Sequence, residues 1–178
     1  GALWTSEMLE AARVKSVPKL DRIVVAVDPA VTGNAGSDLC GIVVVGAVTQ
    51  GPVADWRAYV LEDASVRASS PTDWANAAID AMQRHGADKL VAEVNQGGDM
   101  VESIIRQIDP LVAYRAVRAT RGKTVRAEPV AALYEQGRVI DAAKGDPSDW
   151  KWCRLCGKWW NDSHHNSDQH EKHDLAEQ

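Results

Sequence analysis

The stretch RIVVAVDPA, residues 22–30, has the composition of a central strand in a sheet. Its β-branched residues form an almost unbroken apolar run, which is typical of a strand covered on both faces. The run ends at Asp28-Pro29, and the turn-forming residues VTGNAGSD follow at 31–38. This segment sets the centre of the predicted fold, and an acidic residue closes it.

Four further strands are predicted around this segment. CGIVVVGAV at 40–48 and DWRAYVLED at 55–63 follow it through short connections, which indicates an antiparallel meander. KLVAEV at 89–94 and LVAYRAVRA at 111–119 come later, each after a helical segment. The order of elements predicts an α/β fold in which a mixed five-stranded sheet is flanked by helices.

The helical segment SPTDWANAAIDAMQRHG at 70–86 has its apolar residues at helical spacing. Ser70 or Thr72 is expected to cap its start, and Gly86 to end it. Two more helices are predicted, at residues 98–108 and 122–139. Pro129 marks a start or a kink in the last of them.

The chain has 178 residues, enough for one domain with a core and a small appendage. Its composition changes after about residue 141, where a polar tail holds four of the five histidines. The sequence therefore predicts three parts: a lead-in helix and linker at 1–20, a core domain at 21–143 and a tail segment at 149–175.

Composition also limits where the protein acts. No apolar run approaches the roughly 20 residues of a membrane span, and the N-terminal residues lack the layout of a secretion signal. We expect a soluble, intracellular protein with no membrane contact. The net charge of −5 does not favour general binding to polyanions, so contacts with nucleic acid require a local basic patch.

The stretch LVAEVNQGGDM, residues 90–100, places Glu93 at the end of an apolar strand. A charge there is costly unless a cation meets it. If the strands at 22–30 and 89–94 are parallel neighbours, Asp28 and Glu93 share one rim of the sheet. Carboxylate oxygens are the ligands that Mg²⁺ prefers, and a pair of such ions can hydrolyse a phosphodiester. The alternative is that each carboxylate is only a turn residue at a strand end.

Basic residues gather in the stretch YRAVRATRGKTVR, residues 114–126. Its cationic side chains are Arg115, Arg118, Arg121, Lys123 and Arg126. Beside an acidic centre they would form a track for DNA phosphates that does not read sequence and that weakens with salt. The alternative is that they are ordinary solvated side chains.

Five segments resemble the nuclease domain of phage large terminase subunits, a member of the ribonuclease H-like superfamily. They are GALWTSEMLEAARV, RIVVAVDPA, GIVVVGA, LVAEVNQGGDMVESII and YRAVRATRGKTVRAEPVAALYEQGRV, and they span most of residues 1–139. The resemblance implies a ribonuclease H-like five-stranded sheet. It also implies a two-metal endonuclease that uses Mg²⁺ or Mn²⁺ to cut concatemeric double-stranded viral DNA during packaging. A terminase ATPase, a small terminase subunit and a portal are the partners it implies, in the host cytoplasm.

The resemblance assigns Asp28 to the first-strand aspartate of the family and Glu93 to its fourth-strand acid. The family carries a third acid near its C-terminal end, for which Asp174 is the main candidate and Asp141 and Asp168 are others. No GxxxxGK[ST] loop occurs, so the packaging ATPase is not in this chain. Two other functions remain open: a junction-resolvase-like nuclease, and a nucleic-acid-binding protein that has lost cleavage.

The tail contains a possible zinc site. Cys153 and Cys156 are two residues apart, and His164 and His170 follow them. Two thiolates and two imidazoles form the usual tetrahedral ligand set for zinc. The pattern resembles a C2H2 zinc finger of the matrin or U1-like type, and the preferred ligands are these four residues. The alternative is a disordered terminus rich in histidine.

Overall fold

The computed structural model describes most of the chain in six ranges, which are residues 3–29, 39–67, 70–94, 98–142, 151–153 and 158–160. The chain divides into two compact units, residues 1–143 and 144–178, and each is described by itself.

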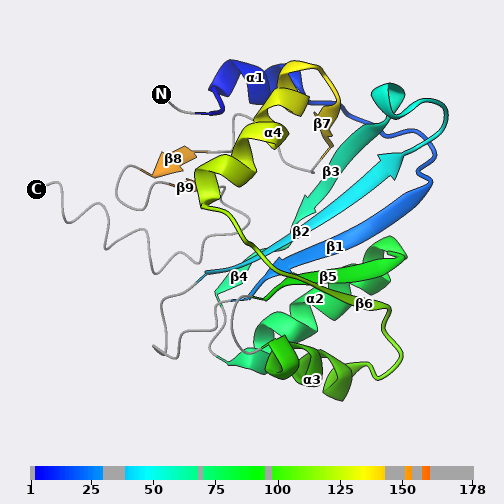
Figure 1. The fold of residues 1–178 in the computed structure, drawn as a ribbon, viewed down its shortest axis with the longest axis vertical. Coiled ribbons are helices and arrows are strands. Elements are labelled where there is room, and N and C mark those ends of the chain that lie inside the picture. Colours follow the sequence, from blue (N-terminus) through cyan, green and yellow to red (C-terminus); the bar gives the residue numbers. More distant parts are fainter. Residues whose placement is uncertain are drawn as a thin grey trace, which may run out of the picture. The chain divides into compact units, whose positions relative to one another are not determined.

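A mixed sheet forms the centre of the first unit (Figure 1). Its strands are β1 (Arg22–Asp28), β2 (Leu39–Val48), β3 (Arg57–Asp63), β4 (Val66–Arg67), β5 (Lys89–Glu93), β6 (Tyr114–Val117) and β7 (Val139–Asp141). They lie in the order β6-β5-β1-β2-β3-β7, and β4 pairs with β2. β1, β2 and β3 form an antiparallel meander, while β5 is parallel to β1 and β6 is parallel to β5. The predicted mixed sheet with flanking helices is confirmed, and the short strands β4 and β7 extend it.

The helices of this unit are α1 (Ser6–Ala11), α2 (Pro71–His85), α3 (Gly98–Ile108) and α4 (Lys123–Glu135), with a short 3-10 turn η1 (Val53–Asp55). At the start of α2, Ser70 and Asp73 cap each other's backbone N–H groups, and Gly86 ends the helix in the left-handed conformation. Pro129 lies inside α4 without ending it. The helix was predicted over residues 122–139 with Gly137 as its stop. It ends at Glu135, Gly137 turns the chain at φ 63° as expected, and Val139 pairs with β3 instead of extending the helix.

The two faces of the sheet are covered differently. The back face, which carries Val25 and Val27 of β1, is packed against α2 and α3 (Figure 1). The buried side chains of this core include Ile42, Val44, Leu90, Trp74, Val101 and Ile105, and Cys40 is buried among them as the sequence suggests. Because these side chains alternate along each strand, the apolar runs in the sequence place one half of their residues in this core.

The front face, which carries Val24, Ala26 and Asp28, is only partly covered. α4 lies on this side and contacts β7, where Ala131 and Val139 are buried. The rings of Trp4 and Tyr134 meet edge to face at 6.2 Å, next to the packing of α1 on α4. β1 was predicted to be covered on both faces, and that prediction is wrong for Ala26, which is exposed. α4 sits toward the β7 edge of the sheet, so it does not bury the middle of β1.

The second unit contains one described element, a hairpin of β8 (Lys151–Cys153) and β9 (Lys158–Trp160). The strands are antiparallel, and Cys153 lies opposite Lys158. The remaining predicted zinc ligands, Cys156, His164 and His170, lie outside the described residues. Over the described part of the chain, the helices are too short and too polar for any of them to span a membrane.

Candidate metal centre and nucleic-acid interface

Asp28 and Glu93 end neighbouring parallel strands. In the register of β1 and β5, Val27 is level with Ala92, so one further step along both strands brings Asp28 level with Glu93. Both residues follow the alternation of the front face, where Asp28 is exposed and the Glu93 side chain keeps 21% of its exposure. The adjacency of the two strands predicted from the sequence is therefore confirmed, with both carboxylates on one rim and one face.

A glycine leaves space beside this carboxylate pair. Gly41 of β2 lies directly opposite Asp28, and antiparallel partners project on the same face of a sheet. A Cβ atom added at Gly41 would lie 3.8 Å from the Cβ of Asp28, which is ordinary van der Waals contact. Any longer side chain at this position would extend over the carboxylate. Gly41 itself therefore places no side chain over Asp28.

Glu93 already has a cationic partner in the chain. Arg126, in the first turns of α4, donates from Nη1 to the Glu93 Oε2 atom at 2.7 Å. The helix thereby reaches from the β7 edge of the front face to the acidic rim. This contact stabilises the charge of Glu93 at the end of an apolar strand, because a guanidinium offsets the penalty of partial burial.

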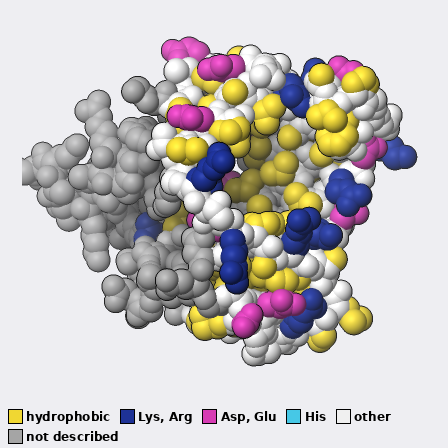
Figure 2. All heavy atoms as spheres, in the orientation of Figure 1, with side chains coloured by type: hydrophobic (Ala, Val, Ile, Leu, Met, Phe, Trp, Pro, Cys, Tyr) yellow, Lys and Arg dark blue, Asp and Glu magenta, His cyan; other side chains and the backbone are white. Residues whose placement is uncertain are grey.

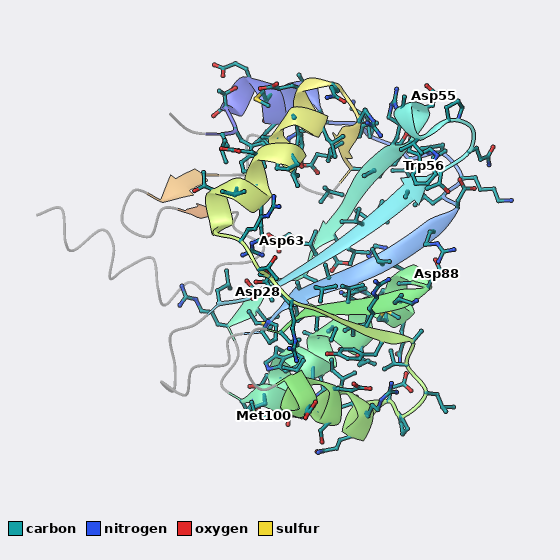
Figure 3. The ribbon with its side chains drawn as sticks, viewed as in Figure 1. Asp28, Asp55, Trp56, Asp63, Asp88 and Met100 are labelled. Atoms are coloured by element: carbon teal, nitrogen blue, oxygen red, sulfur yellow. The ribbon has the colours of Figure 1, made fainter. Side chains whose placement is uncertain are left out.

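Asp63 is a further carboxylate at the same end of the sheet that the sequence reasoning missed. It ends β3 and lies level with Val43, which places it on the front face (Figure 3). Its Oδ1 atom accepts a hydrogen bond from the Ser65 N–H at 3.0 Å. The signal was available in the sequence, because a third strand of a meander runs parallel to the first and ends at the same rim. Figure 3 shows Asp55 and Asp88 at the opposite end.

The third acid is not found among the described residues. They contain no group of three or more acidic, histidine or cysteine side chains placed to hold one metal ion. Asp141 ends β7, three strands from β1, and about 14 Å at the usual strand spacing is too far for a shared ion. Its backbone is bonded instead to Ala12 and Val14. Asp168 and Asp174 lie outside the described residues.

The predicted basic residues lie around the front face. Arg115 of β6 is level with Val91, which puts it on the face of Glu93, and it is exposed. Arg118 and Arg121 are exposed in the link from β6 to α4, and Lys123 begins α4. By the same register, this face also carries two cations that the sequence reasoning did not single out, Arg22 and Lys89. Figure 2 shows Lys and Arg side chains around a hollow floored by hydrophobic side chains.

Comparison with known folds defines the class of protein first. The chain superposes on the nuclease domain of the large terminase subunit gp2 of bacterial virus Sf6 with a TM-score of 0.58 and 13% identity, over 97% of this chain and 91% of that one. A K428A mutant of that domain, with manganese and β-thujaplicinol, gives 0.52 and 16%, over 97% and 79%. The fold is that of ribonuclease H-like nucleases.

The family follows from the sequence match. The model of the family described as the terminase RNaseH-like domain matches residues 25–177, which is most of the chain. The chain therefore belongs to this family, as the resemblance of its segments implies. A comparison with curated proteins finds no match.

Proposed function

We propose that this protein is a divalent-metal-dependent DNA endonuclease of terminase type. The observation that carries the proposal is the placement of Asp28 and Glu93 on one rim and one face, at the ends of adjacent parallel strands. Membership of the terminase RNaseH-like family supports it. The related Sf6 domain has been obtained with manganese, which supports Mn²⁺ or Mg²⁺ as the cofactor here.

The residues present fit such a cofactor. Asp28 and Glu93 supply carboxylate oxygens, which hard divalent cations prefer, and Gly41 places no side chain over Asp28. When bound, a pair of ions activates water and stabilises the leaving oxygen of a phosphodiester. The protein's own part is to hold the ions with Asp28 and Glu93 and to align the DNA strand over the front face. We propose Asp174 as the third acid, and the extension of the family match to residue 177 supports a role for the tail in the same domain.

The basic residues give the DNA a path to this rim. Arg115, Arg118 and Arg121 are exposed on or beside the front face, and α4 begins at Lys123 with no side-chain cap among the described residues. Backbone N–H groups at a helix start attract phosphate, and arginine contacts it through charge and hydrogen bonds. Because the chain has a net charge of −5, DNA binding depends on this local patch and weakens with salt.

We propose that the enzyme acts in viral DNA packaging, with double-stranded DNA as its substrate. A terminase ATPase, the small terminase subunit and the portal are its proposed partners. The alternatives are cleavage of branched DNA, as by a junction resolvase, and DNA binding without cleavage. The fold and the basic residues suit all three, so the choice among them depends on whether DNA is cut and on which substrate is cut.

The tail is proposed to bind one zinc ion through Cys153, Cys156, His164 and His170. Cys153 ends β8, and in the sequence Cys156 comes three residues after it and before β9. Purified protein should contain one zinc ion per chain, measured by atomic emission, and Cys153→Ser should lose it. Zinc-free wild-type protein would contradict this part of the proposal.

Nicking of a supercoiled plasmid tests the nuclease proposal. We expect nicking with Mn²⁺ or Mg²⁺, none after chelation, and none in Glu93→Gln with either ion. Substituting a four-way junction of matched length identifies a resolvase by preferential cleavage of the branch. Protein that binds DNA but leaves all substrates intact with both ions would leave the binding-only alternative in place of the nuclease.

A further inference from the structure

The ion pair between Arg126 and Glu93 joins two groups that the proposed function uses separately. Glu93 is proposed to hold metal, and Arg126 lies in the stretch proposed to bind phosphate. The Nη1–Oε2 distance of 2.7 Å is that of a charge-assisted hydrogen bond. In the protein without metal, one atom of the metal-binding carboxylate is thus already occupied by an arginine.

Two features of its surroundings disfavour the guanidinium of Arg126 in this position. Its Nε atom is buried and has no hydrogen-bond partner among the residues that the structure describes, so part of the guanidinium is unsatisfied there. It also lies near the N-terminus of α4, where the helix dipole disfavours a positive charge. By contrast, Arg106 pairs with Glu102 on the surface of α3 and also donates to the carbonyl of Pro110. Arg126 is therefore easier to move than Arg106, whose Nε and Nη1 atoms both donate hydrogen bonds.

We propose that Arg126 is a displaceable counter-ion of Glu93 that couples metal loading to DNA binding. Before metal binds, the guanidinium neutralises the carboxylate and keeps the rim assembled. When a divalent ion takes the carboxylate, Arg126 turns toward the open front face and contacts a DNA phosphate. This inference rests on the proposed function, because it takes Glu93 as a metal ligand and the front face as the DNA surface.

Electrostatics gives the displacement its direction. A divalent cation on Glu93 and a guanidinium on the same oxygen would place like charges a few ångströms apart, and such charges repel strongly in a partly buried site. The ion carries twice the charge of the arginine, so it takes the carboxylate. The Arg126 side chain is 36% exposed and needs no opening of the core to turn outward. Phosphate is then the anion that satisfies it.

Linkage makes the effect reciprocal. If metal frees Arg126 for phosphate, DNA that binds Arg126 must in turn favour metal at Glu93 by the same factor. The metal-free protein would hold DNA with one cation fewer. The metal-loaded protein would gain that cation next to the scissile strand.

Metal titration tests the first half of the inference. Calorimetric titration of the full chain with Mn²⁺ should show Arg126→Gln binding the ion about three- to tenfold more tightly than wild type, because a partly buried ion pair that competes for Glu93 is lost. Arg115→Gln, a front-face arginine outside the pair, is the matched control and should change the affinity less than twofold, as expected for an exposed charge. Thermal melting of both variants shows that they fold.

The outcomes separate the inference from the proposed function. Unchanged or weaker Mn²⁺ binding in Arg126→Gln overturns the counter-ion, since it would show that Arg126 only positions Glu93 or does nothing there. If wild type binds no Mn²⁺, or if Glu93→Gln binds it as well as wild type, the metal role of Glu93 fails and the inference fails with it.

DNA binding tests the second half. In a chelator, Arg126→Gln should bind a short duplex within about twofold of wild type, whereas in Ca²⁺, used as a non-cleaving ion, it should bind several-fold more weakly. The slope of log affinity against log salt should fall by about 1 in calcium alone, because one phosphate contact is lost. Arg115→Gln should weaken binding equally in both conditions. An equal loss for Arg126→Gln in both would refute the coupling, and no loss in calcium would refute the phosphate contact.

Discussion

On the back face of the sheet, β1, β2 and β5 bury their side chains under α2 and α3, whereas on the front face the same strands expose Ala26 and Asp28. One set of strands thus serves two purposes, because alternate residues point to opposite faces. The back face contributes the apolar burial that stabilises the fold. The front face contributes little burial around β1, so it can carry charges that a core would not tolerate. Substitutions on the two faces should accordingly separate stability from activity.

The largest expected effect is the loss of catalysis in Asp28→Asn. The substitution keeps the shape of the side chain and removes the charge proposed to hold metal, so metal-dependent nicking should fall by roughly a thousandfold or more. The melting temperature should stay the same or rise, because one of two neighbouring like charges is removed. Plasmid nicking and thermal unfolding measure the two effects.

Asp55→Asn is the matched control for this prediction. Asp55 lies in η1 at the opposite end of the sheet, as Figure 3 shows. It should nick as wild type does. If Asp28→Asn nicks normally, or if it unfolds, the division of labour between the faces is wrong at its most important residue.

The largest effect on stability is expected on the back face. Leu90 is completely buried, and Leu90→Ala should lower the free energy of unfolding by about 3 kcal/mol through lost burial and a cavity. On the front face, Val43 is half-buried beside Ala26, and Val43→Ala should cost only about 1 kcal/mol. Urea unfolding followed by circular dichroism measures both. Equal losses would show that the front face is covered as well as the back.

Much of this division could be predicted from the sequence. Apolar segments identified the five predicted strands, and the acids that close two of them identified the rim, because charge at the end of an apolar strand has few explanations. The antiparallel meander and the helical crossovers then fixed the directions of the strands. Asp28 and Glu93 followed from local pattern and chain direction together.

Other features depend on contacts between distant segments and were missed. Val139 was predicted as the end of a helix, but together with Ile140 it adds a strand to β3 from far along the chain. The exposure of Ala26 depends on where α4 rests, which no pattern within β1 records. The pairing of Arg126 with Glu93 joins residues 33 positions apart, and arginine at helical spacing gives no indication of its partner.

Two glycines of β2, one on each face of the sheet, test the comparison of the faces through smaller effects on activity and stability. Gly41 faces Asp28 on the front, and Gly41→Val should lower nicking and Mn²⁺ affinity about tenfold, or roughly 1.4 kcal/mol, by filling the space beside the carboxylate. Gly41→Ala should be close to wild type, because its Cβ makes only ordinary contact with Asp28. Stability should be retained in both, since valine and alanine fit a strand at least as well as glycine.

Gly46 is the counterpart on the buried side of β2. A Cβ there would lie 2.5 Å from Leu20 Cδ1, so Gly46→Ala must displace that side chain and should cost about 1 kcal/mol of stability. Its nicking, measured below the melting temperature, should equal that of wild type. A loss of metal binding in Gly46→Ala with stability unchanged would reverse the assignment of the two faces.

The smallest expected effect concerns the stability contributed by Glu62. This carboxylate points to the back face, whereas its neighbour Asp63 points to the front. Burial alone would raise the pKa of Glu62, but hydrogen bonds from His85 and Arg84 of α2 outweigh it, and the pKa is lowered from its ordinary value of 4.5. A carboxyl group whose pKa is lower in the folded state stabilises the fold at pH values above its unfolded-state pKa. It loses that contribution as the pH falls through its folded-state pKa.

Glu62→Gln should therefore reduce the free energy of unfolding by about 0.5–1 kcal/mol at pH 7, and the difference from wild type should shrink steadily below pH 4.5. Glu128→Gln, at an exposed position of α4, is the control and should leave the free energy of unfolding at pH 7 close to that of wild type. Urea unfolding across pH 3 to 7 measures both variants, and a difference for Glu62→Gln that persists unchanged at the acid end would show that its effect comes from shape and not from charge.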